Sequence, residues 1–249
     1  MRRGFVVLIL ITFVINVGLG YAFIHQADGV VLELKKIKST DANRLRIQVC
    51  AEDIIRVTAT RQCFSKRPSL IVDKTEWDPV AWTLDEEGEI LVLKTAKLSI
   101  KVHQENGTVA FYDANGHLLL QEKAKGSKII TPTAVMGEQT YHIQQLFESP
   151  KDEAFFGLGQ HQNNIMNYKG HDVDLWQYNV VAAVPFLVSS KNYGILWDNN
   201  SRSKFGDIRD FESLSTLKLI DKDGKEGGLT AEYFKDANFT SLFTTQQES

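Results

Sequence analysis

GTVAFYDANGHLLLQEK, residues 107–123, decides the fold class of this chain, because two apolar runs lie on either side of a turn sequence. The turn is Asp113–Gly116, and its Asn-Gly step tolerates the positive backbone angles that tight hairpin turns require. Apolar runs on both sides of such a turn are typical of paired antiparallel strands. The stretch therefore predicts a β-hairpin.

Strand signals of the same kind continue on both sides of this hairpin. Residues 45–60 alternate and are rich in Val, Ile and Thr, and residues 89–103 place Ile90 and Val92, and then Leu98, Ile100 and Val102, at a period of two. Residues 184–199 indicate another strand pair, turned at Lys191–Asn192. No long window shows a convincing helical periodicity. Short strands at regular spacing predict an all-β fold, an antiparallel β-sandwich, rather than a βα architecture.

The size and charge of the chain limit the classes of protein to consider. It has 249 residues, 43% of them hydrophobic, which permits one large β domain or two small ones. The formal net charge is −3. Nucleic acid is excluded as the main partner, because neutralising phosphates requires clustered Lys and Arg.

The first residues predict export. Two arginines precede a long apolar run without charges, and the run ends in Gly20-Tyr21-Ala22. A basic start, an apolar middle and a small-x-small ending are typical of a signal peptide, here residues 1–22. The alternative is an uncleaved membrane anchor. We expect an exported protein in the periplasm or at the cell surface, with a mature charge of about −5 once Arg2 and Arg3 are removed.

Composition divides the rest of the chain into three parts. Residues 23–220 read as the sandwich, residues 221–228 as a charged, Gly-rich linker, and residues 229–249 as the beginning of a further domain that is cut short. The strand-like run Leu229–Phe234 has no evident partner strand in the sequence. A lone strand is not independently stable, so this last part is expected to be incomplete.

Cysteine and histidine give no metal or cofactor signal. Cys50 and Cys63 are compatible with one disulfide in an oxidising compartment or with two separate thiols. His161 and His171 lie ten residues apart with no cysteine or acid at a fixed spacing, which makes them weak ligand candidates. We expect no metal site and no cofactor.

The carboxylates Asp172 and Asp174 deserve comparison with a glycosidase pair. On a strand they would face the same side about 7 Å apart, a spacing compatible with an inverting enzyme. Alternating Asp-Val-Asp-Leu is also the usual pattern of a solvent-facing strand, and we favour that interpretation. No Gly-x-Ser-x-Gly elbow or phosphate-binding loop occurs.

Residues 155–179, FFGLGQHQNNIMNYKGHDVDLWQYN, combine aromatic rings with many amides. Flat rings stack on sugars and amides bond to hydroxyls, but the same residue types also fill cores and turns. From the residues alone the two interpretations are balanced.

The run from Phe155 to Asp207 resembles the N-terminal β-sandwich of glycoside hydrolase family 31, and most closely its exported α-xylosidase branch in Bacteroidetes. The segments that carry the resemblance are Gly157–Gln162, Gln177–Asn179, Val184–Ser190 and Leu196–Asn199. The upstream strands fit the same domain more loosely. The tail from Asp221 to Phe234 looks like the junction where that branch carries a protective-antigen-type insert domain.

The resemblance implies a galactose-mutarotase-like sandwich and a retaining α-xylosidase or α-glucosidase as the parent enzyme, with xyloglucan-type oligosaccharides as substrates. In that family the catalytic aspartates lie on a (β/α)8 barrel that follows the sandwich, so no residue of this chain inherits a catalytic role. The chain alone is expected to be inactive, and its partners are the missing barrel and the sugar. The rival expectation is a free-standing carbohydrate-binding module.

The resemblance also assigns a substrate-binding loop. The family's loop at the mouth of the sugar pocket falls on Trp176, Gln177, Tyr178 and Asn179. Many α-glucosidases have an acid where this sequence has Asn179, and the Gln-Tyr-Asn form is similar to the α-xylosidase branch.

Overall fold

A computed structural model of the 249-residue chain describes residues 15–18, 21–74, 76–124, 126–206, 219–220, 224, 226 and 229–248. The chain divides into two compact units. The first comprises residues 1–169 and 173–203, and the second comprises residues 170–172 and 204–249. All regular elements of the described residues are strands, as the sequence predicts.

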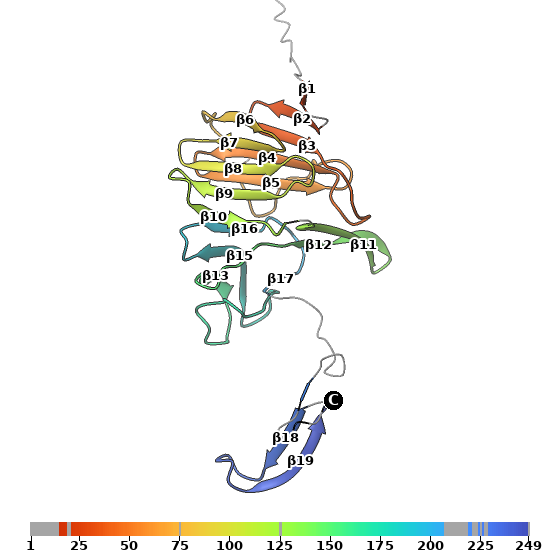
Figure 1. The fold of residues 1–249 in the computed structure, drawn as a ribbon, viewed down its shortest axis with the longest axis vertical. Coiled ribbons are helices and arrows are strands. Elements are labelled where there is room, and N and C mark those ends of the chain that lie inside the picture. The colour runs from red at the N-terminus through yellow and green to blue at the C-terminus, as the bar shows by residue number, and fades with distance from the viewer. Residues whose placement is uncertain are drawn as a thin grey trace, which may run out of the picture. The chain divides into compact units, whose positions relative to one another are not determined.

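Two five-stranded antiparallel sheets form the main body of the first unit (Figure 1). Each is a meander in which consecutive strands pair. The first contains β1 (Ile15–Gly18), β2 (Tyr21–Gln26), β3 (Gly29–Glu33), β4 (Arg44–Ala51) and β5 (Ile54–Thr60). The second contains β6 (Thr83–Glu87), β7 (Ile90–Lys94), β8 (Leu98–His103), β9 (Val109–Asp113) and β10 (Leu118–Gln121).

The core lies between these two sheets, which confirms the β-sandwich. Every second residue of β4 and β8 points into it, as the period of two in their sequences predicts, and Val30 and Leu32 of β3 join them. Burying these aliphatic side chains is the main favourable contribution to folding. The buried cluster contains Val30, Leu32, Leu45, Ile47, Leu91, Leu93, Ile100, Val102 and Val109.

The predicted hairpin at residues 107–123 is present as β9 and β10. Its turn is closed by Asp113, whose carboxylate accepts hydrogen bonds from the backbone N–H groups of Asn115 and His117, each at 2.8 Å. The His117 side chain lies 3.0 Å from the same carboxylate and lowers the pKa of Asp113. Gly116 adopts a φ of 83°, as an Asn-Gly turn requires.

The run at residues 45–60 differs from its sequence reading as one alternating stretch. The structure divides it into β4 and β5, which pair with each other across a turn at Glu52 and Asp53. Alternation continues on both sides of the turn, so the pattern alone did not reveal the reversal of direction.

A hairpin and a smaller sheet complete the first unit. The hairpin contains β11 (Lys128–Val135) and β12 (Glu138–Gln145). The smaller sheet has the strand order β13-β15-β16, formed by Phe155–Gln160, Ala182–Ser189 and Gly194–Leu196. The pair β15 and β16 confirms the predicted turn near Lys191–Asn192. Two short strands remain: β14 (Val173–Leu175) lies between β13 and β15 along the chain, and β17 (Ser203–Phe205) follows β16.

A buried ion pair ties β11 to the sandwich. Lys128 and Glu122 have side chains that are 6% and 3% exposed and contact each other directly. Lys128 Nζ also donates to Gly107 O at 2.8 Å. Ser127 Oγ and Val109 N donate to the Glu122 carboxylate at 3.1 and 3.0 Å. Burial lowers the pKa of Lys128, and the adjacent carboxylate counteracts this.

The second unit contains one described hairpin, β18 (Leu229–Phe234) and β19 (Leu242–Glu248). The expectation that Leu229–Phe234 has no partner strand is therefore wrong. The strand itself is where the sequence predicts it, but the polar residues of Leu242–Glu248 conceal a second strand. An isolated hairpin is only marginally stable, so the predicted further domain at residues 229–249 stays a prediction.

Three other expectations concern the signal peptide, the linker and the cysteine pair, and the described residues cover them only in part. Of the predicted signal peptide, residues 1–14, 19 and 20 lie outside the described residues, as do most of residues 221–228, the predicted linker. No helix in the described part of the chain is long and apolar enough to cross a membrane. Cys50 is buried and Cys63 is exposed, and both are free thiols, so the structure favours separate cysteines over a disulfide.

Candidate functional site: a polar loop beside an exposed apolar sheet

The four predicted site residues lie together in the loop that connects β14 to β15. The loop turns back at Tyr178, whose carbonyl accepts a hydrogen bond from the N–H of Val181 at 3.0 Å. The side-chain amide of Gln177 closes the loop from within. Its Nε2 donates to Val181 O, and its Oε1 accepts from Ala183 N at 3.0 Å. Gln177 therefore holds the loop, while its neighbours at the turn are presented to solvent.

The aromatic members of the loop are exposed rather than packed into the core. Trp176 is 51% exposed and Tyr178 is 55% exposed, and Asn179 is also at the surface. The core interpretation therefore fails for Trp176 and Tyr178 but holds for Phe155 and Tyr168 of the same run, which are buried. Exposed rings with a polar atom beside them are suited to sugars, which offer an apolar C–H face and surrounding hydroxyls.

Asp174 does not have the surroundings of a general acid. Arg202 lies just before β17, and its Nε donates to Asp174 Oδ1 at 3.0 Å while its Nη2 contacts Oδ2. Both carboxylate oxygens are thus engaged by one guanidinium group. Such pairing favours the ionised form, whereas a general acid must hold a proton. Asp172 belongs to the second unit and is exposed.

The loop leads directly into a strand with one uncovered apolar face. Along β15 the side chains of Val184, Phe186 and Val188 are 47%, 42% and 39% exposed. Leu196 of β16 pairs with Phe186 and is 46% exposed. The ring of Phe186 also lies over Gly194, where an added Cβ would meet it at 2.8 Å. We call the four side chains Val184, Phe186, Val188 and Leu196 the apolar face.

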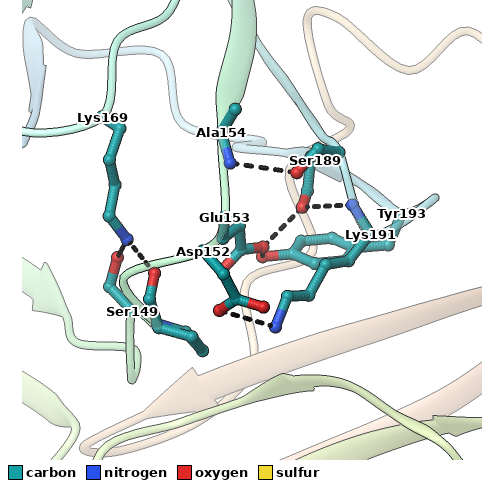
Figure 2. A network of polar contacts seen from close by, with 10 residues as sticks. Ser149, Asp152, Glu153, Ala154, Lys169, Ser189, Lys191 and Tyr193 are labelled. Carbon is teal, nitrogen blue, oxygen red and sulfur yellow. Dashed lines mark hydrogen bonds and ion pairs between the residues drawn. The ribbon is translucent and has the colours of Figure 1, made fainter.

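The opposite side of β15 is held by a buried polar network (Figure 2). Glu153, 3% exposed, accepts hydrogen bonds from Ser189 Oγ and Tyr193 Oη, each at 2.5 Å. Ser190 Oγ accepts from Ala154 N at 3.0 Å. Buried polar groups need such partners, and these bonds link the start of β13 to the end of β15. The apolar face is therefore displayed by a strand whose other side is firmly attached.

Substitution of Tyr193 with Phe tests this network. Burial and the bond to Glu153 raise the pKa of Tyr193, so the hydroxyl stabilises the fold below pH 10 and this contribution is lost as the pH rises through the higher folded-state pKa. We expect Tyr193→Phe to lower the free energy of unfolding by about 1–3 kcal/mol at pH 7. In urea titrations, the difference in the free energy of unfolding between Tyr193→Phe and wild type should become smaller above pH 10. The exposed Tyr141, changed to Phe, is the control; an equal loss there would contradict the assignment.

A glycine bulge brings β13 into register with β15. Gly157, Leu158 and Gly159 all have positive φ, at 95°, 62° and 100°, and the strand pairing shifts between the two glycines. A Cβ at Gly159 would lie 1.8 Å from the carbonyl oxygen of Ala182. The two glycines are thus required because the backbones of β13 and β15 approach each other closely here, and they have a structural role.

Neither histidine of the run, His161 or His171, has the surroundings of a metal ligand or a catalytic base. His161 Nε2 lies 2.9 Å from Leu158 O, and its ring meets that of Tyr168 edge to face. His171 is exposed. Among the residues that the structure describes, no group of three His, Cys, Asp or Glu side chains is placed to hold a metal ion.

Sequence reasoning missed two residues that organise this region. Glu153 follows Lys151 and Asp152 and so resembles a surface charge, although it is buried. Arg202 lies 28 residues from Asp174, and no spacing rule connects them. Both act through contacts between distant segments, which a single sequence does not display.

The paired sheets, the bulge and the exposed loop together define an all-β domain of the β-sandwich class. Residues 44–205 match the family model described as the glycosyl hydrolase 31 N-terminal galactose mutarotase-like domain. The chain belongs to this family, in agreement with the resemblance read from the sequence.

Similar proteins are glycosidases several times longer than this chain. An α-xylosidase of Saccharolobus solfataricus is 30% identical over 171 residues, which cover 63% of this chain and 22% of that protein. The crystal structure of an α-xylosidase from Xanthomonas citri shares 40% identity with a TM-score of 0.69, covering 90% of this chain and 24% of that one. An α-xylosidase from a soil metagenome, complexed with xylose, gives 26% identity and a TM-score of 0.60, over 73% and 28%. The chain thus spans about a quarter of the length of these relatives.

Proposed function

We propose that this chain is the non-catalytic N-terminal domain of an exported α-glycosidase of the α-xylosidase type. In this role it packs on a catalytic barrel and borders the sugar pocket with the loop Trp176–Asn179. The observation that carries the proposal is the apolar face, which lies on the same strand that the loop enters. Large apolar side chains gathered on one exposed face mark an interaction surface.

The occupant of the apolar face is a catalytic barrel. The chain covers only 22% to 28% of its α-xylosidase relatives, so most of each relative is a segment with no counterpart in this chain. The second part of the proposal, that the loop borders the sugar pocket, follows because the loop runs directly into β15. The loop is exposed up to Val180, and exposed positions then alternate along β15, so a partner covering the apolar face would adjoin the loop.

Complementation with the Xanthomonas citri α-xylosidase tests the proposal. A version of that enzyme lacking its N-terminal quarter is co-purified with this chain, and we expect a complex that hydrolyses an aryl α-xyloside. Phe186→Asp should abolish the complex because a charge at the centre of the apolar face opposes burial. The control is Ile37→Asp, at a side chain that is 69% exposed in the connection between β3 and β4 and should have no effect. A complex that survives Phe186→Asp would exclude this face.

The 249-residue chain by itself should not hydrolyse an aryl α-xyloside. The reason is that Asp174 is engaged by Arg202 and that the family resemblance places both catalytic aspartates on the barrel. Turnover by the purified chain that disappears in Asp172→Asn would overturn this expectation. Export is part of the same proposal, and it rests on the apolar N-terminal run. Intact mass and N-terminal sequencing of protein recovered from the periplasm should show Phe23 as the first residue.

A carbohydrate-binding module is the second candidate, and the exposure of Trp176 and Tyr178 favours it. It predicts binding of xyloglucan oligosaccharides by the chain without a barrel. Isothermal titration separates the two candidates. Sugar binding by the chain alone that is lost in Trp176→Ala supports a module. If the loop Trp176–Asn179 instead only borders the pocket of a barrel, sugar should release no heat of binding until the complex with the barrel is formed.

A further inference from the structure

Trp176 is held in place by a residue pair that no sequence feature assigns to the sugar site. The guanidinium carbon of Arg202 lies 5.3 Å from the centre of the Trp176 ring, over its face. Asp174, two residues before Trp176, binds the same guanidinium through both of its oxygens. Arg202 therefore bridges the carboxylate and the indole.

The remaining surface of the indole is available. Trp176 is 51% exposed although Arg202 covers one side of its ring. The indole N–H groups of Trp82 and Trp197 are bonded to Ala27 O and Ser203 Oγ, at 3.1 and 3.2 Å. Within the described residues no such bond is found for Trp176. Its N–H and its open face are thus presented together.

We propose that Arg202 and Asp174 are positioning residues that fix the indole of Trp176 as a stacking platform for a pyranose ring. This inference rests on the proposed function, since it deepens the role of the loop Trp176–Asn179. A two-pronged Arg–carboxylate contact has a defined geometry, and a guanidinium stacks flat on an indole. The arrangement removes side-chain freedom before the ligand arrives, so less ordering cost remains for binding.

The ligand chemistry follows from what the platform offers. The open ring face suits the apolar C–H face of a pyranose, and the indole N–H suits a hydroxyl acceptor on the same ring. The positive charge of Arg202 is balanced by Asp174, so the platform does not select an anionic sugar. We therefore expect a neutral pyranose in an oligosaccharide.

The test combines a ring measurement on the full 249-residue chain with a binding measurement on the chain alone and in its complex with the truncated Xanthomonas citri enzyme. The indole N–H resonance of Trp176 is assigned by its disappearance in Trp176→Phe and followed in Arg202→Ala, Arg202→Lys and Asp174→Asn. A xyloglucan-derived heptasaccharide is then titrated into each variant. We expect the resonance to shift in all three variants, with unchanged thermal midpoints, and the sugar affinity to fall about 3- to 10-fold. Asp174→Glu, which keeps a carboxylate, should restore part of the affinity.

The outcomes separate this inference from the proposed function. The positioning role is contradicted if Arg202→Ala keeps full sugar affinity and an unshifted Trp176 resonance while Trp176→Ala loses binding. That result would still support sugar recognition by the loop. A wild-type chain that binds no sugar, free or in the complex with the Xanthomonas citri partner, overturns the loop's recognition function and the platform with it. A lowered thermal midpoint that accounts for the affinity loss in every variant shows a merely structural role.

Discussion

Lys128→Met is expected to lower the free energy of unfolding by about 3–5 kcal/mol, because it leaves the Glu122 carboxylate buried without its counter-charge. Glu122 is 3% exposed, and its remaining donors, Ser127 Oγ and Val109 N, are neutral. The substitution also leaves Gly107 O without the Nζ donor that it has at 2.8 Å. Urea unfolding followed by circular dichroism measures the loss directly.

The matched control for this prediction is Lys35→Met. Lys35 forms an ion pair with Glu105 at 2.9 Å, but the two side chains are 69% and 31% exposed. Ion pairs in such surroundings contribute about 0–1 kcal/mol. Equal losses in the two variants would contradict the view that burial gives the Lys128–Glu122 pair its effect. A double variant, Lys128→Met with Glu122→Leu, should recover much of the stability because no unpaired charge remains.

Gly159→Ala is expected to cost a similar amount, about 3–5 kcal/mol, and to separate β13 from β15. Alanine would have to adopt a φ of 100°, and its Cβ would lie 1.8 Å from Ala182 O and 2.8 Å from Val184 N. These are backbone atoms of the strand that carries the apolar face, so relief of the clash must move that strand. The variant should therefore lose partner binding together with stability, in unfolding and co-purification experiments on the same sample.

Gly116→Ala is the control for strain without a clash. Gly116 has a φ of 83°, but nothing lies within 4 Å of an added Cβ. The expected cost is about 1 kcal/mol, from the backbone conformation alone. If Gly159→Ala cost no more than this, the close approach at Ala182 would not be a constraint on the fold.

The sandwich was predictable because its strands alternate. Ile100 and Val102 of β8 keep the period of two that the sequence displays, whereas Leu91, Val92 and Leu93 of β7 are all buried, so the predicted alternation fails in that strand. The turn at Asp113–Gly116 was predictable from its own residues. Both signals are local, and local signals can be read from one chain.

The candidate site was predictable only in its location. The family resemblance indicated the loop Trp176–Asn179, but the role of Gln177 as an internal brace depends on its bonds to Val181 and Ala183. The contributions of Glu153 and Arg202 depend on partners 36 and 28 residues away. The strand β19 was missed because its polar residues give no apolar pattern.

The two sides of β15 also have a consequence for how this polypeptide is made. The side bound to Glu153 requires only residues of the first unit, so the small sheet can form as soon as β16 has been synthesised. From that moment the apolar face is uncovered, and an exposed apolar face of this kind favours self-association at high concentration. We expect purified wild type to aggregate faster than Phe186→Asp in light-scattering measurements, since a charge at an exposed strand discourages self-association. We therefore expect self-association to be strongest in the interval between the synthesis of β16 and the burial of the apolar face.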